Sequence, residues 1–114
     1  MNIQIFGTAK CFDTKKAQRY FKERNIKFQY IDLNVKSMSK GEIQSVRTAT
    51  GCSLEDMINE KSKSYEKSFI KYLAGEDAKI EKLQEYGDLF KTPIVRNGKQ
   101  ATIGYKPEVW KTWE

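Results

Sequence analysis

The sequence predicts a single α/β domain built around a mixed β-sheet. Three observations carry this prediction: a strand–helix–strand pattern over residues 2–33, a helical middle, and a hairpin followed by a helix at the end of the chain. The length of 114 residues suits one domain. We therefore expect one domain over residues 1–114, in which about residues 39–87 form a helical insert.

The strand–helix–strand unit opens the chain. Residues 2–6 (NIQIF) alternate polar and apolar side chains, which predicts a strand with Ile3 and Ile5 on its buried face. Residues 13–24 repeat apolar side chains at helical spacing, and residues 27–33 predict a second strand. Because the unit is short, we expect its two strands to be parallel, with a right-handed crossover.

The middle of the chain is predicted to be helical. Residues 39–42 (SKGE) form a capping-box pattern that marks a helix start, and Ser53 is expected to cap a short helix over residues 53–58. Residues 64–74 and 77–87 are each expected to form one helix that ends at a glycine.

The end of the chain returns to strands. Residues 93–96 and 99–104 flank Asn97 and Gly98, and this pair predicts a hairpin with a type I′ turn. A proline at position 107 suits the first turn of a helix over residues 107–113.

Composition limits the classes of function. The net charge is +6, but the 21 basic residues are interleaved with 15 acidic ones, which favours a solvated surface over a nucleic-acid interface. A basic surface can also attract small oxyanions or acidic proteins. No apolar run is long enough for a membrane span, and no signal-peptide pattern opens the chain. Two distant cysteines form no disulfide framework, so we expect a reducing cytoplasm.

Cys11 is the candidate for chemistry. It lies where the first strand turns into the first helix, and the unpaired N–H groups at a helix start stabilise a thiolate. Thr14 follows one helical turn later, so its hydroxyl is expected to donate to the sulfur. The alternative is a small buried apolar cysteine. Nearby positive charge favours a reactive thiol; it comes from Lys10, Lys15 and Lys16.

Other chemistry finds little support in the sequence. The chain has no histidine, which excludes cysteine–histidine dyads, serine–histidine triads and histidine-bearing metal sites, so we expect no metal. Cys52 has two interpretations: a resolving thiol that attacks an adduct on Cys11, or a structural cysteine.

Several motifs in register carry a family resemblance. They are CFDTKKA at residues 11–17, SKSY at 62–65, TPIV at 92–95 and GYKP at 104–107. With them the chain resembles, over nearly its whole length, the arsenate reductase-like family of the thioredoxin superfamily, which includes the Spx regulators. The resemblance implies a thioredoxin-like fold: a mixed four-stranded sheet flanked by helices, with an inserted helical block. It also implies that Cys11 is the nucleophile and that Pro93 is cis and faces it.

The resemblance further implies an oxyanion site near the thiol. Arsenate reductases hold the oxyanion with three arginines, whose positions match Lys61, Thr92 and Lys106 here. A lysine is a point charge and lacks the planar fork of an arginine. Spx switches usually carry a C-x-x-C pair, and Thr14 stands at the position of the second cysteine.

Two functions follow from the resemblance. The first is a thiol-dependent oxidoreductase without a bound cofactor, in which the Cys11 thiolate attacks an oxyanion or a disulfide. An external thiol, such as glutathione, glutaredoxin or thioredoxin, then releases the product. The alternative is a non-catalytic, redox-responsive regulator of the Spx type that binds a protein partner such as RNA polymerase. Neither interpretation involves a membrane.

Overall fold

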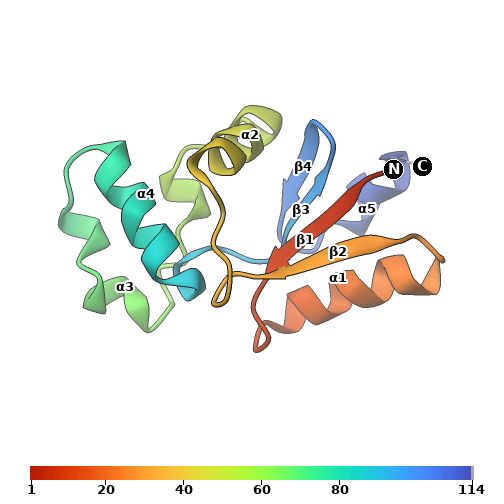
Figure 1. Ribbon diagram of the computed structural model, residues 1–114, viewed down its shortest axis with the longest axis horizontal. Helices are drawn as coiled ribbons and strands as arrows, with labels where there is room; N and C mark the ends of the chain where they lie inside the picture. Colours follow the sequence, from red (N-terminus) through yellow and green to blue (C-terminus); the bar gives the residue numbers. More distant parts are fainter. Residues whose placement is uncertain (114) are drawn as a thin grey trace.

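The computed structural model describes residues 1–113, and its centre is a four-stranded sheet in the order β2-β1-β3-β4 (Figure 1). The strands are β1 (Ile3–Gly7), β2 (Phe28–Asp32), β3 (Ile94–Asn97) and β4 (Gln100–Ile103). β1 runs parallel to β2 and antiparallel to β3, which in turn runs antiparallel to β4. The predicted mixed sheet and the parallel first pair are confirmed.

One face of the sheet is covered by α1 (Phe12–Glu23) and α5 (Pro107–Trp110). Ile3 and Ile5 are buried on this face, as predicted, against apolar side chains of α1. The indole of Trp110 closes this core, and its Nε1 donates a hydrogen bond of 2.8 Å to Oγ1 of Thr102 in β4. Pro107 occupies the first turn of α5, and one 3-10 turn over Lys111–Trp113 follows it.

The helical insert covers the other face and extends beyond the sheet, on the left of Figure 1. It contains α2 (Lys40–Thr50), α3 (Ser64–Lys67) and α4 (Glu76–Glu85). Three single 3-10 turns connect them to one another and to β3: η1 (Glu55–Met57), η2 (Ile70–Tyr72) and η3 (Gly87–Leu89). Because α2 packs against β4, the insert shares an apolar core with the sheet. None of the helices within residues 1–113 is both long and apolar enough to cross a membrane.

The capping box at the start of α2 is confirmed. The Ser39 hydroxyl accepts from the backbone N–H of Glu42 at 3.1 Å, and the Glu42 carboxylate accepts from the backbone N–H of Ser39 at 2.9 Å. The same carboxylate forms an ion pair with Arg96 of β3 at 3.4 Å. The helix start is therefore attached to the sheet as well as capped.

The prediction of one helix over residues 64–74 is wrong. The chain breaks at Phe69, whose φ is 57°, and forms α3 and η2 instead. The Ser68 hydroxyl donates to the carbonyl of Tyr65 and accepts from the N–H of Ile70, so its side chain replaces helical backbone bonds. Residues 53–58 likewise contain only one 3-10 turn, η1, and its N-terminal capping residue is Leu54 rather than the expected Ser53. The Ser53 hydroxyl still accepts from the N–H of Asp56, and the Asp56 carboxylate accepts from the N–H of Ser53.

Gly87 does not end α4, contrary to the prediction. The helix ends at Glu85, and Gly87 begins η3. A Cβ on this glycine would clash with the carbonyl oxygen of Leu33, so the close approach of two backbones requires glycine here.

The hairpin is confirmed, but its turn type is wrong. Asn97 pairs with Gln100, so the two turn residues are Gly98 and Lys99, and only Gly98 has a positive φ, of 61°. A type I′ turn needs positive φ at both positions, whereas glycine at the first fits type II′. Asn97 stays in the strand because its side chain accepts from the N–H of Asn2 and donates to the side chain of Gln100.

Candidate functional site

Cys11 is the N-terminal capping residue of α1. Its backbone N–H donates to the carbonyl of Thr8 at 3.1 Å, which closes the turn after β1. Its thiol is free and half-buried, and Sγ donates to the carbonyl oxygen of Thr92 at 3.6 Å. The first N–H groups of α1 lack acceptors within the helix, so the sulfur lies at a backbone end that favours negative charge.

Thr14 has a packing role. It is buried against Gly7, and a Cβ on Gly7 would clash with its side chain, so α1 and β1 approach closely here. Among residues 1–113 the Thr14 hydroxyl finds no hydrogen-bond partner. The predicted bond from Thr14 to the Cys11 sulfur is therefore absent from this structure.

The insert is attached to the segment before β3 by backbone hydrogen bonds. The N–H of Asn59 donates to the carbonyl of Leu89 at 2.7 Å, and the N–H of Lys91 donates to the carbonyl of Met57 at 2.8 Å. Between them, Ile58 and Phe90 form an antiparallel bridge. This attachment brings the chain after Ile58 and the chain before Pro93 close to the Cys11 thiol, since Asn59 and Thr92 line the same cavities. The Thr92–Pro93 peptide bond is cis.

Two cavities open beside the thiol, and Cys11, Asn59 and Thr92 line both. The first has a volume of about 530 Å³, and its polar walls include Asn34, Ser62, Lys63 and Asp88. The second has a volume of about 750 Å³, and its charged walls include Glu55, Asp56, Glu60, Lys61 and Lys91. Cys11 is thus accessible from two sides.

The structure brings together some of the predicted site residues. Cys11, Lys61 and Thr92 line the second cavity together. Pro93 is buried directly behind Thr92 and lines neither cavity. Lys106 is exposed and also lines neither, although its Cε lies 3.9 Å from where a Cβ on Gly104, a lining residue, would be.

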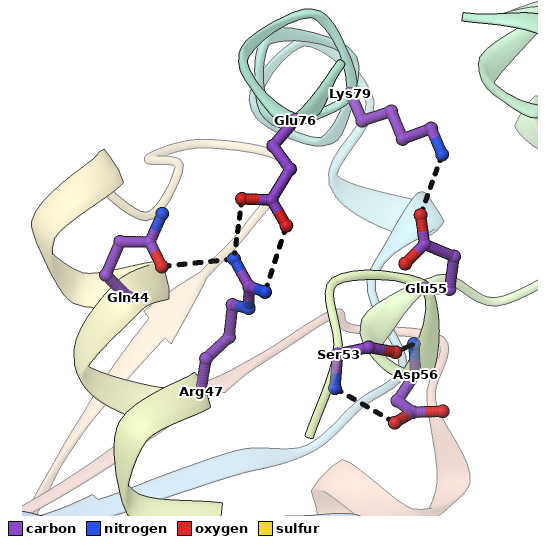
Figure 2. A network of polar contacts seen from close by, with 7 residues as sticks. All are labelled: Gln44, Arg47, Ser53, Glu55, Asp56, Glu76 and Lys79. Carbon is purple, nitrogen blue, oxygen red and sulfur yellow. Dashed lines mark hydrogen bonds and ion pairs between the residues drawn. The ribbon is translucent and has the colours of Figure 1, made fainter. Parts of the chain in front are cut away.

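Acidic groups balance the lysines of the second cavity. A hydrogen bond from Lys79 lowers the pKa of Glu55, and the two form an ion pair of 2.7 Å. Hydrogen bonds from the backbone and side chain of Ser53 lower the pKa of Asp56. Figure 2 shows both contacts, beside the ion pair between Arg47 and Glu76 that joins α2 to α4. Both carboxylates are therefore ionised at neutral pH.

Asp88 places a further negative charge in the first cavity. Burial alone would raise its pKa, but hydrogen bonds from the hydroxyls of Ser62 and Ser64 outweigh burial and lower it. The same bonds attach the start of α3 to η3. Lys10 and Lys63 also line the first cavity, so the ionised carboxylate of Asp88 offsets one of two lysine charges there.

Tyr30 is a neutral aromatic group near the thiol. Its pKa is raised, first by burial and then by the negative charges of Asp32 and of the ionised Cys11. The phenol consequently stays protonated across the neutral range.

Cys52 lies apart from this site. It is half-buried, packs against the core of the insert and lines neither cavity of Cys11. This environment favours the structural interpretation of Cys52 over the resolving one.

Several lining residues were missed by the sequence analysis, namely Asn34, Asn59, Ser62, Lys63, Asp88 and Lys91. Lys91 directly precedes Thr92, so its position next to a predicted site residue could have revealed it. The others follow from the attachment of the insert, which leaves no local pattern in the sequence.

Comparison with known proteins agrees with this fold. The profile of the ArsC family matches residues 6–113, so the chain belongs to the ArsC family. Among solved structures, a Bacteroides fragilis protein described as related to this family gives a TM-score of 0.84 at 20% identity and covers 100% of this chain and 98% of its own. An arsenate reductase from Vibrio cholerae gives a TM-score of 0.79 at 22% identity, and the match covers 96% of this chain and 94% of the reductase. These likenesses show the thioredoxin-like fold.

Relatives by sequence include an uncharacterised protein and regulators. The uncharacterised protein YusI of Bacillus subtilis is 25% identical over 111 residues, which cover 95% of this chain and 94% of YusI. The global transcriptional regulator Spx 2 of Oceanobacillus iheyensis is 25% identical over 109 residues, 92% of this chain and 78% of the regulator.

Proposed function

We propose that this protein is a thiol-dependent oxidoreductase in which Cys11 is the nucleophile. The observation that carries the proposal is the position of the thiol, on the N-terminal capping residue of α1 and in the wall of two cavities. The N–H groups at the helix start stabilise the thiolate, which is the reactive form of cysteine.

The reaction is a pair of thiol–disulfide exchanges. The Cys11 thiolate attacks one sulfur of a disulfide, a new S–S bond forms, and the other sulfur leaves as a thiolate that takes a proton from water. An external thiol, from glutathione, glutaredoxin or thioredoxin, then attacks the substrate-derived sulfur and releases the Cys11 thiolate. The external thiol supplies the reducing electrons, so no bound cofactor is needed.

A disulfide fits this site better than an arsenate-like oxyanion. Lys61 and Lys91 share their cavity with three acidic side chains, and Thr92 supplies no cation. Lys106 lies outside both cavities, so the cationic cluster that would hold an oxyanion is not assembled. Because a lysine offers a point charge without a planar fork, it replaces an arginine only in part.

The test compares two cysteine variants on two substrates. With a glutathione mixed disulfide as substrate and glutathione as reductant, we expect turnover by the native chain and by Cys52→Ser, and none by Cys11→Ser. With arsenate as substrate we expect a much slower reaction. Equal activity of Cys11→Ser and the native chain would refute the role of Cys11. Faster turnover of arsenate would refute the substrate preference.

A regulatory function is the second candidate, favoured by the Spx relatives, which align over 92–93% of this chain. In that case oxidation of the Cys11 thiol would be the regulatory signal, and the exposed surface would bind a protein such as RNA polymerase. Binding of purified RNA polymerase, together with no turnover of disulfides, would favour this candidate.

A further inference from the structure

A separate cavity lies between α1 and the start of α5, on the sheet face opposite the insert. Its volume is about 480 Å³. Four cationic side chains line it, against the single acid Glu23: Lys16, Arg19, Arg24 and Lys111. We call it the α1–α5 cavity. Its excess of positive charge is larger than that of either cavity beside Cys11.

The four cations have no acidic partners in the described chain. The ion pairs found within residues 1–113 all lie inside the insert or join it to β3. The positive charges of the α1–α5 cavity are consequently available to an external anion.

Two of the cations are held in place by aromatic rings. The guanidinium carbon of Arg24 lies 3.7 Å from the centroid of the Tyr20 ring, and its Nη1 donates to the Tyr20 carbonyl at 3.1 Å. The Nζ of Lys16 lies 5.1 Å from the centroid of the Tyr105 ring. Side chains held in this way lose less conformational entropy when they bind a ligand.

Tyr20 supplies a second, independent observation. It lines the cavity with only 4% of its surface exposed, and its hydroxyl is buried without a hydrogen-bond partner among residues 1–113. A buried hydroxyl without a partner is uncommon in native proteins and calls for an explanation, such as a ligand. A ligand oxygen bound within hydrogen-bond distance of this hydroxyl would satisfy it.

The number of cations selects the class of anion. Four cationic side chains and one acidic side chain line a single cavity of about 480 Å³. One phosphate group carries a charge of at most about −2 and offsets only part of this excess, whereas two or three linked phosphates offset all of it. The arginine forks also match phosphate oxygens. We propose that the α1–α5 cavity binds a small molecule that carries two or more linked phosphate groups.

The experiment is calorimetric titration of the full chain with sodium pyrophosphate at low ionic strength. We expect saturable binding, and a loss of about tenfold or more in affinity in the double variant Arg19→Gln/Lys111→Gln. Within residues 1–113 neither side chain forms a hydrogen bond, an ion pair or a cation–π contact, so we expect the variant to keep the fold. The matched control, Lys36→Gln/Lys99→Gln, removes the same charge elsewhere on the surface and is expected to stay within about twofold of the native affinity.

Two results would overturn the proposal: no saturable binding by the native chain, or an equal loss in the control pair, which would indicate a general charge effect. Amide chemical shifts locate the ligand. Changes confined to residues 16–24 and 105–111 support the cavity, and changes centred on residues 8–12 contradict it. Because Cys11→Ser is expected to bind pyrophosphate normally, failure here is distinguishable from failure of the proposed enzyme function.

Discussion

The thiol of Cys11 has two competing neighbours, a carbonyl oxygen and the start of a helix. The carbonyl of Thr92 accepts a hydrogen bond from the protonated thiol. The N–H groups at the start of α1 favour the ionised sulfur. Ionisation of the thiol removes its hydrogen bond to the Thr92 carbonyl and gains the favourable interaction with the helix start. The reactivity of Cys11 therefore shows which of the two neighbours dominates.

We predict that the helix start dominates. In Cys52→Ser, Cys11 should be alkylated at neutral pH faster than free cysteine is under the same conditions. The control is Cys11→Ser, in which Cys52 should label more slowly because it packs against apolar side chains. A rate no higher than that of free cysteine would leave Cys11 without an activated sulfur and would contradict the proposed function.

Thr14 gives a second prediction. Its hydroxyl is buried without a partner, so Thr14→Val exchanges an unsatisfied polar atom for a methyl group of similar shape. We expect the free energy of unfolding in urea to be unchanged or to rise by about 1 kcal/mol. Alkylation of Cys11 should keep its rate. A slower alkylation would show that the hydroxyl reaches the sulfur during the reaction.

Two glycines provide a matched pair. Gly87→Ala should lower the free energy of unfolding by about 1–3 kcal/mol, because the new Cβ meets the rigid backbone of Leu33. Gly41 lies in the first turn of α2, where a new Cβ would make only an ordinary contact of 3.9 Å with the Ser39 hydroxyl, so Gly41→Ala should raise stability by about 0.5–1 kcal/mol. Urea denaturation of both variants tests this. Equal effects would contradict the clash at Gly87.

Among the elements, η3 and α3 are joined by Asp88. Because its pKa is lowered in the folded protein, the ionised carboxylate adds stability above the unfolded value of about 3.9. That contribution disappears as the pH falls through the lower, folded pKa. We therefore expect Asp88→Asn to be less stable than the native chain at pH 5–7, and this difference to shrink toward pH 3. Urea midpoints measured across this range test it, and a constant difference would contradict it.

The sequence predicted elements best where a local pattern determines them. The alternation of Ile3 and Ile5 marked β1, and the pair Ser39 and Glu42 marked the start of α2. The break at Phe69 was missed, since apolar spacing alone suggested a continuous helix and Ser68 was not recognised as a competitor for backbone bonds.

The candidate site was predicted only in part, for a related reason. Cys11 and Thr92 adjoin predicted strands, so their meeting followed from the expected fold. Asp88 and Ser62 depend on how the insert is attached to the sheet, and Lys106 depends on the path of the chain after β4. Contacts between distant segments of this kind leave no periodicity in the sequence.

At the scale of the molecule, the sheet separates two apolar cores of unequal size. The smaller core, between the sheet and α1 with α5, depends on Trp110, which is 1% exposed and packs edge-on against Tyr20 and Tyr105. Its indole also satisfies the buried hydroxyl of Thr102. Loss of this one side chain therefore affects packing and hydrogen bonding together.

We predict that Trp110→Ala lowers the free energy of unfolding by about 3–5 kcal/mol, as the removal of a large buried side chain usually does. The matched control is Trp113→Ala, a half-buried tryptophan at the edge of the same core, for which we expect a clearly smaller loss. Circular dichroism during urea denaturation measures both. A larger loss at Trp113 would contradict the position of α5 described above.

The attachment of the insert to the chain before Pro93 has a consequence for the evolution of this family. It is made by main-chain atoms of residues 57–59 and 89–91, which every amino acid except proline supplies equally. Substitutions at the exposed positions of this stretch can therefore accumulate without moving Cys11. Under the proposed function, a lineage can change the substrate that its members accept by altering side chains such as Lys61 and Glu60, while the thiol and its helix are inherited unchanged.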